Sequence, residues 1–176
     1  MVLSVSHVDA KLGELFGSRT AEIVPDAITA TLAAELRGRF SYERYGLVDR
    51  GSYELCRLDE PALFGKLAEI VLKRTGRILA VVDAIALRMS AGDYVLAHHD
   101  RVLEGNPIEI VLDVSAEVTP DAEVHYRRRG SVYFRVPSQP RAMAIVERGP
   151  TVTCNHTYVS KRHAGASVVR LIALLR

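Results

Sequence analysis

The sequence has few cysteines, with only Cys56 and Cys154 among its 176 residues. Neither residue belongs to a C-x-x-C pair or to the spacing of a zinc finger. This excludes a small secreted scaffold held together by disulfides and a structural zinc site built on thiolates. We therefore expect two buried, reduced thiols in a reducing compartment.

Long apolar runs are also absent, since no stretch approaches the ~20 residues that cross a bilayer. The start, MVLSVSHVDAKLGEL, has no basic residues followed by an apolar run, so we expect no signal peptide. The formal net charge is only +2, which gives little attraction for nucleic acid. We expect a cytoplasmic protein that has neither a membrane nor a nucleic acid as its partner.

What the chain does have is enough apolar sequence for one core. It is 48% hydrophobic and 25% charged, as in globular proteins, and its length suits a single domain. There is no internal repeat, low-complexity tract or linker. We expect one domain over residues 1–176, with a helical support region over 1–77 and a β-barrel core over 78–176.

Two helices are predicted in the first region. Residues 24–40 place apolar side chains on one helical face, with Asp26 as the cap and Gly38 as the end. Residues 59–76 form the second helix, with Asp59 near its cap. The segment between them, FSYERYGLVDRGSYEL, is extended and has a turn at its centre.

From about residue 78 the helical period disappears. Short segments rich in β-branched residues follow one another, separated by turn signals such as SAGD, EGNP, RRRG and PSQP. The segments are RILAVVDAIALRM, YVLAHH, IEIVLDVS, AEVHY, SVYFRV, AMAIVE, TVTCNH and SVVRLIALL. Many short strands at this spacing indicate an antiparallel sandwich or barrel.

The stretch GDYVLAHHDR contains the first candidate site. In a strand, residues i and i+2 share a face, so His98 and Asp100 project together while His99 points away. An imidazole and a carboxylate on one face can bind a divalent metal; the alternative is a solvated strand end. His156, in TVTCNHTYV, is the candidate second imidazole, and its alternative is a buried core histidine.

Arg170 interrupts the apolar strand SVVRLIALL, where it cannot shed its charge and needs an anion. Residues 160–166 form a turn before this strand. A hairpin centred on that turn pairs Arg170 with His156, about 5 Å apart at their Cβ atoms. His163 at the turn and His125 near the RRRG turn are rival ligands.

Two histidines and one carboxylate on one side of an iron ion leave its other positions open, as in non-haem Fe(II) oxygenases. An arginine near such a site suits the far carboxylate of a dicarboxylic co-substrate.

The run LRMSAGDYVLAHHD, then NHTYV, then VVRL, resembles the Fe(II)/2-oxoglutarate-dependent oxygenase superfamily, in particular its prolyl-hydroxylase-like branch. The resemblance covers roughly residues 85–176 and extends weakly to IVPDAITATLAAEL near the start. It implies a mainly β fold with flanking helices: a double-stranded β-helix, a jelly-roll or cupin-like barrel, with N-terminal helices packed on one side.

The resemblance also implies roles. Arg170 binds the 5-carboxylate of 2-oxoglutarate, and Tyr94 supports that carboxylate or is a plain core tyrosine. Arg88 and Arg128 are substrate contacts or, alternatively, a surface ion pair and part of a solvated turn. The implied iron ligands are His98, Asp100 and His156.

The implied activity is a dioxygenase that uses Fe(II), 2-oxoglutarate and O2. It hydroxylates a C–H bond of a small molecule or an amino-acid or peptide substrate while 2-oxoglutarate is decarboxylated to succinate. Asp100 favours hydroxylation, because related halogenases have a small residue at that position. The sequence departs from the branch at two places: Met89 stands where many members have tyrosine, and the glycine-rich hairpin is missing. These departures leave the subfamily and the substrate open.

Two alternatives remain at this stage. Arg170 and Arg176 have the R-x5-R spacing of AlkB-like nucleic-acid demethylases, although the asparagine and tyrosine that precede H-x-D in those enzymes are missing. The other alternative is a non-catalytic barrel, either a cupin-like module that binds a metal or ligand or an inert structural domain.

Overall fold

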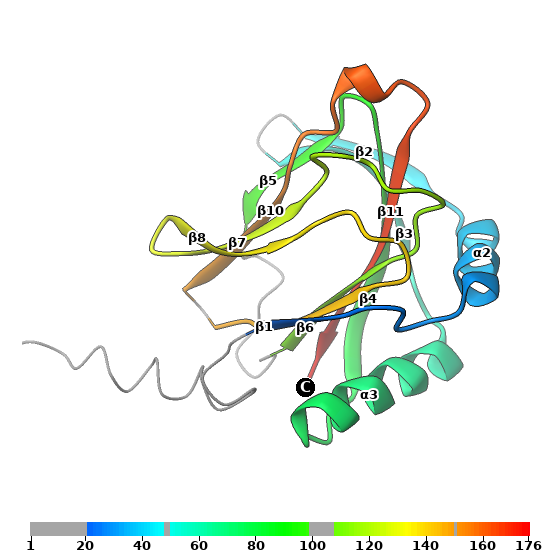
Figure 1. Ribbon diagram of the computed structural model, residues 1–176, viewed down its shortest axis with the longest axis vertical. Coiled ribbons are helices and arrows are strands. Elements are labelled where there is room, and N and C mark those ends of the chain that lie inside the picture. Colours follow the sequence, from blue (N-terminus) through cyan, green and yellow to red (C-terminus); the bar gives the residue numbers. More distant parts are fainter. Residues whose placement is uncertain (1–20, 48–49, 99–107, 150) are drawn as a thin grey trace, which may run out of the picture.

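The computed structural model describes residues 21–47, 50–98, 108–149 and 151–176 (Figure 1). In these ranges the chain forms two α-helices, a short 3-10 helix and eleven strands. In chain order they are β1 (Ala21–Val24), α2 (Ala30–Arg39), β2 (Glu43–Leu47), β3 (Gly51–Arg57), α3 (Pro61–Thr75), β4 (Val81–Ser90), β5 (Tyr94–His98), β6 (Ile108–Asp113), β7 (Val124–Arg128), β8 (Ser131–Val136), β9 (Met143–Glu147), β10 (Val152–His156), η1 (Lys161–His163) and β11 (Ser167–Leu175).

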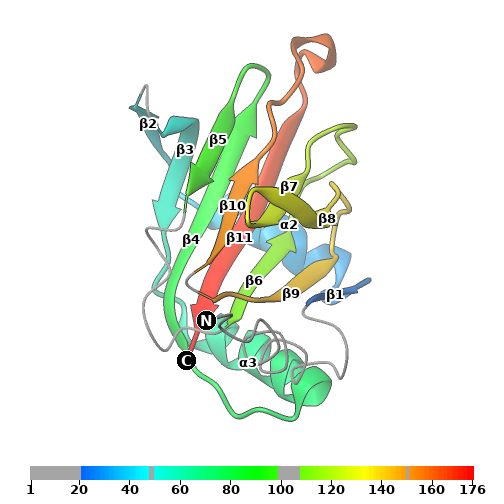
Figure 2. The same ribbon diagram turned by 90° about the vertical axis from the view of Figure 1, so that its left-hand side faces the viewer.

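All the strands belong to one antiparallel sheet, in the order β1-β9-β6-β11-β4-β3-β5-β10-β7-β8, with β2 paired to β3. The sheet curls back so that the half containing β5, β10 and β7 faces the half containing β4, β11 and β6 (Figures 1 and 2). Apolar side chains from both halves pack into one interior cluster, which includes Val111 and Ile172 from one half and Val124 and Val152 from the other. This is the expected jelly-roll barrel, and the eight strand segments predicted from residue 78 onward are confirmed.

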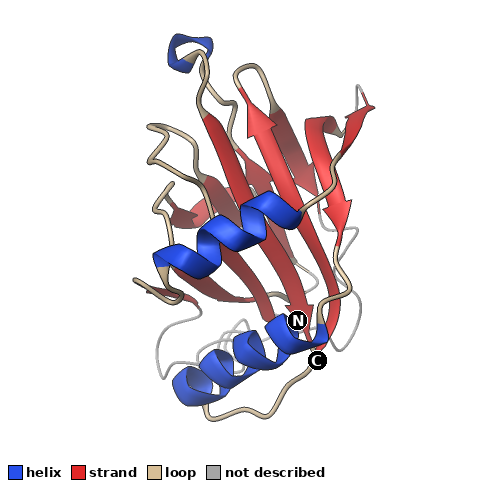
Figure 3. Cartoon of the chain, turned by 90° about the vertical axis from the view of Figure 1, so that its right-hand side faces the viewer, coloured by secondary structure: helices blue, strands red, loops and turns tan. Residues whose placement is uncertain are grey.

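The two helices cover the outer face of the β9-β6-β11-β4 half (Figure 3). Leu36 of α2 and Leu67 of α3 pack against this face together with Leu171 of β11. Because β11 lies between this helical layer and the barrel interior, both of its faces are buried. This explains why its sequence is apolar throughout rather than alternating.

The first predicted helix begins later and ends later than expected. Thr29, not Asp26, is its N-cap, and its hydroxyl accepts a hydrogen bond from the Leu32 N–H at 3.2 Å. Asp26 has a φ of 49° and belongs to the turn before the helix. The helix continues through Gly38 to Arg39.

The second helix lies within the predicted residues 59–76. It begins at Pro61, and Gly76 closes it in the left-handed conformation with a φ of 70°. Its N-cap is Glu60, beside the expected Asp59, and makes no side-chain cap bond. Among the described residues, no helix is long and apolar enough to cross a membrane.

The first 77 residues contribute strands as well as helices. The hairpin β2–β3 joins the sheet through β3, which pairs with both β4 and β5, and β1 pairs with β9. The extended segment predicted between the two helices is therefore this hairpin, while the centre of its turn, residues 48–49, lies outside the described residues.

Candidate functional site

Arg170 of β11 points into the barrel and is among the most deeply buried side chains, at 1% exposure. Its Nη2 donates to the Ala122 carbonyl at 2.6 Å, and its Nη1 lies 3.2 Å from His156 Nδ1. Burial lowers the pKa of Arg170, partly offset by the charge of Asp113. No ion pair to a carboxylate satisfies this guanidinium within the described ranges.

His156 ends β10 and is buried, at 3% exposure. In the ladder between β10 and β5, His156 pairs with Val95 and Cys154 pairs with His98. The backbone of His98 is therefore two residues along the ladder from His156, a diagonal separation of about 7–8 Å. The side chain of His98 and the whole of Asp100 lie outside the described residues, so the predicted triad itself stays a prediction.

The predicted hairpin between His156 and Arg170 is wrong. Strand β10 pairs with β5 and β7, whereas β11 pairs with β4 and β6. The connection through η1 carries the chain from one half of the barrel to the other. The two side chains nevertheless meet, because they approach each other across the barrel interior rather than along a shared ladder.

Regular alternation along a strand would put Tyr94 on the same face as His98. The register shows an extra residue in β5 between Val95 and His98, which interrupts that alternation. Tyr94 is partly buried and pairs with Ser52 of β3, while its neighbour Val95 belongs to the interior cluster. Its support of a co-substrate stays a prediction.

The two candidate substrate arginines lie in different settings. Arg88 forms an ion pair with Glu54, and its guanidinium lies 4.2 Å from the centre of the Tyr42 ring, which matches the alternative of a surface ion pair. Arg128 of β7 places its guanidinium 4.9 Å from the centre of the Tyr133 ring.

The rival histidines have other partners or positions. His125 Nε2 lies 2.6 Å from a Glu123 carboxylate oxygen. His163 ends η1 and is partly exposed. No group of three or more potential metal-binding side chains occurs in the ranges that are described, which exclude Asp100 and the His98 side chain.

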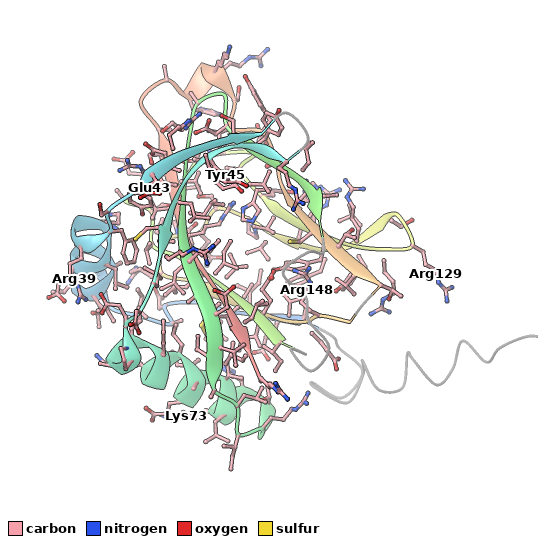
Figure 4. The ribbon with its side chains drawn as sticks, turned by 180° about the vertical axis from the view of Figure 1, so that it is seen from behind. Arg39, Glu43, Tyr45, Lys73, Arg129 and Arg148 are labelled. Atoms are coloured by element: carbon pink, nitrogen blue, oxygen red, sulfur yellow. The ribbon has the colours of Figure 1, made fainter. Side chains whose placement is uncertain are left out.

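A second polar cluster inside the barrel was missed by sequence reasoning. We call it the Arg148 cluster; it consists of Glu109, Tyr126, Arg148 and Cys154. Arg148 Nη1 donates to Glu109 Oε2 at 2.7 Å and to Cys154 Sγ at 3.3 Å, and the Tyr126 hydroxyl donates to Glu109 Oε1 at 2.7 Å. Arg148 lies inside the barrel, whereas Arg129 extends away at the tip of a hairpin (Figure 4).

Burial governs the ionisation of this cluster. It raises the pKa of Tyr126 well above its usual value, and the neighbouring Glu109 adds to the effect. Burial alone opposes the charge on Arg148, but Glu109, Cys154 and Tyr126 together outweigh it, so the pKa of Arg148 lies above its ordinary value. The sequence signal for this cluster is Glu109, a charged residue at an interior-facing position of the apolar run IEIVLD. Arg170 gives the same kind of signal in its apolar strand.

No family model matches the sequence, and no curated protein matches it. The fold, however, is similar to that of several solved structures. A prolyl-4-hydroxylase from Pseudomonas putida superposes with a TM-score of 0.66 at 14% identity, covering 95% of this chain and 97% of that one. A protein of the 2OG-Fe(II) oxygenase family from Burkholderia pseudomallei gives 0.69 at 13%, covering 99% and 92%.

A third similar structure is HygX from Streptomyces hygroscopicus with nickel, 2-oxoglutarate and hygromycin B bound. Its TM-score is 0.61 at 10% identity, with 96% of this chain and 86% of that chain covered. Sequence identities this low establish the architecture alone. The protein has the double-stranded β-helix fold that these oxygenases share.

Proposed function

We propose that the protein is an Fe(II)- and 2-oxoglutarate-dependent dioxygenase that hydroxylates a C–H bond of a small molecule or of an amino-acid or peptide substrate. The observation that carries the proposal is the buried guanidinium of Arg170, which contacts His156 inside a barrel of this fold. A buried cation without a carboxylate partner in the described chain is costly, and an anionic co-substrate would neutralise it.

The residues present suit the iron and the co-substrate. His98, Asp100 and His156 supply two imidazoles and a carboxylate, a donor set suited to non-haem Fe(II). Once bound, the iron and 2-oxoglutarate supply the oxidising power, and O2 is the oxidant. The protein's own contribution is to orient these groups and exclude water, for which the apolar lining of the barrel is suited.

Arg170 has a defined task in this proposal. A carboxylate bound to it would take the Nη1 hydrogen bond that His156 Nδ1 now accepts. Arginine keeps its proton in proteins, so Nδ1 is the acceptor in the present contact. Loading the site would therefore exchange an imidazole for a carboxylate at the same guanidinium.

The proposed compartment is the cytoplasm. It is supported by Cys56 and Cys154, which form no disulfide. Only Cys154 is buried, whereas Cys56, which was also expected to be buried, is partly exposed. Reduced thiols suit a reducing compartment.

The test is anaerobic loading with Fe(II) and 2-oxoglutarate. We expect the weak visible charge-transfer band of the iron chelate, and release of succinate once O2 and a substrate are added. Arg170→Met should remove the band at 2-oxoglutarate concentrations that saturate the unmodified protein. The matched control is Arg39→Met, which removes an exposed helical arginine and should leave the band unchanged. Absence of the band from the unmodified protein would refute the proposal.

A further inference from the structure

In the Arg148 cluster, both carboxylate oxygens of Glu109 have hydrogen-bond partners, whereas the guanidinium of Arg148 has partners for only some of its N–H groups. Both oxygens of Glu109 accept a short hydrogen bond, one from Tyr126 and one from Arg148. Arg148 also donates from Nη2 to the Val152 carbonyl at 3.4 Å. The Nε of Arg148, however, is buried and has no hydrogen-bond partner in the described structure.

A second buried donor lies within range of the Arg148 charge. Tyr133 of β8 packs against the interior cluster, and its hydroxyl is also buried without a hydrogen-bond partner in the chain as described. Burial raises the pKa of Tyr133 to about 12, and Arg128 and Arg148 are the nearby charges that oppose this rise. At ordinary pH the hydroxyl therefore keeps its proton and can donate.

Native proteins seldom leave buried donors without an acceptor, and two together indicate that something else supplies it. Each of these two groups is a donor, so the partner that it lacks is an acceptor. A carbonyl oxygen has two lone pairs and can accept from both at once.

The surrounding charges select the kind of acceptor. Tyr133 is surrounded by Arg128, Arg148, Glu109 and Glu147, whose formal charges cancel. A ligand carboxylate would gain little from this balanced set, and it would have to lie near two acids. A neutral carbonyl meets the two donors without that repulsion.

We propose that Tyr133 and Arg148 form a subsite that binds the uncharged carbonyl oxygen of an amide-type group on the substrate. The inference rests on the proposed function, since it specifies the substrate of that site. Its position supports it: Arg148 contacts Cys154, and Cys154 pairs with His98 in the ladder between β10 and β5. A group held at Arg148 would therefore lie near Cys154, two residues before His156 on β10 and opposite the backbone of His98 in the ladder.

The experiment uses acetamide and acetate as probes, because they match in size and differ in charge. The metal-free protein is titrated with each, and the Arg148 Nε–H signal is followed by NMR. We expect acetamide to shift this signal in a saturable manner and acetate to bind several-fold more weakly. Tyr133→Phe removes one of the two donors, so the acetamide affinity should fall roughly 2- to 10-fold, the worth of one neutral hydrogen bond.

Tyr158→Phe makes the same chemical change at an exposed tyrosine and should leave the affinity unchanged. The inference is overturned if acetamide does not move the Arg148 signal, which would mean that water alone serves these donors. It is equally overturned if acetate binds as tightly as acetamide, or if Tyr133→Phe has no effect on affinity. No iron or 2-oxoglutarate enters this titration, so its failure is separate from a missing charge-transfer band.

Discussion

The two faces of the β9-β6-β11-β4 half of the sheet differ in a way that separates folding from function. The face under the helices is packed mainly with apolar side chains, among them Leu36, Leu67 and Leu171. The face inside the barrel carries buried charges, including Glu109, Asp113 and Arg170. Burying charge costs free energy that an apolar residue would avoid. The interior face is therefore not arranged for stability alone.

The buried charges of the interior are themselves of two kinds. Asp113 accepts backbone hydrogen bonds from Ser115 and Gln139, and the charge of Arg148 is paired with that of Glu109, so both charges have partners within the fold. Arg170 has only a carbonyl and an imidazole as its described partners. The comparison predicts that satisfied charges matter most for stability and that Arg170 matters most for ligand binding.

The largest loss of stability is expected from Arg148→Met. The substitution leaves the Glu109 carboxylate buried without its cation, which should lower the free energy of unfolding by about 3–5 kcal/mol. Urea unfolding measures this. Adding Glu109→Gln to the variant removes the stranded charge and should recover part of the loss; no recovery would mean that the ion pair is not the cause.

Leu171→Ala should lower the free energy of unfolding by about 2–5 kcal/mol, because it opens a cavity between β11 and the helices. The variant should bind 2-oxoglutarate with an affinity within about twofold of the unmodified protein, because the Leu171 side chain faces the helices. Its loss of stability comes from the lost apolar burial and from the cavity left behind. Calorimetric titration of the folded variant checks this. A large loss of affinity would show that the two faces are coupled.

The helical layer can also be weakened from its surface. Thr29→Ala removes the side-chain cap of α2 and should cost about 1 kcal/mol in the free energy of unfolding. Thr29→Ser retains the hydroxyl and should restore nearly all of it. Equal stability of the two variants would show that the cap contributes nothing.

The smallest stability change is expected from Arg170→Met. Losing two hydrogen bonds is offset by removing a buried charge, so the free energy of unfolding should change by less than about 1 kcal/mol. Its 2-oxoglutarate affinity, by contrast, should fall by roughly 30-fold or more, the loss expected when one partner of a buried charge pair is removed. A variant that unfolds readily would place Arg170 among the structural charges instead.

The strands after residue 78 could be predicted because each β-branched segment is bounded by a turn signal, and local pattern carries that information. The pairing of those strands could not. The ten residues between His156 and Ser167 suggested a hairpin, yet they cross from one half of the barrel to the other, and only the tertiary fold decides between these outcomes.

The candidate site, like the fold, could be predicted where a local pattern marks it and not where distant segments meet. A lone arginine in an apolar strand signals a buried charge by itself, so Arg170 could be identified from its neighbours. The extra residue in β5 before His98 could not, because nothing in YVLAH marks a bulge, and it alters which residues share a face. The Arg148 cluster joins residues from four separate segments, which no local pattern brings together.

The most direct test of the account is the position of iron in crystals grown anaerobically with Fe(II) and 2-oxoglutarate, located by anomalous scattering at the iron edge. The account predicts one iron ion bound by His98, Asp100 and His156, with the 5-carboxylate of 2-oxoglutarate on Arg170. Iron bound without His156, or Arg170 still bonded to the His156 ring in the loaded protein, would contradict it.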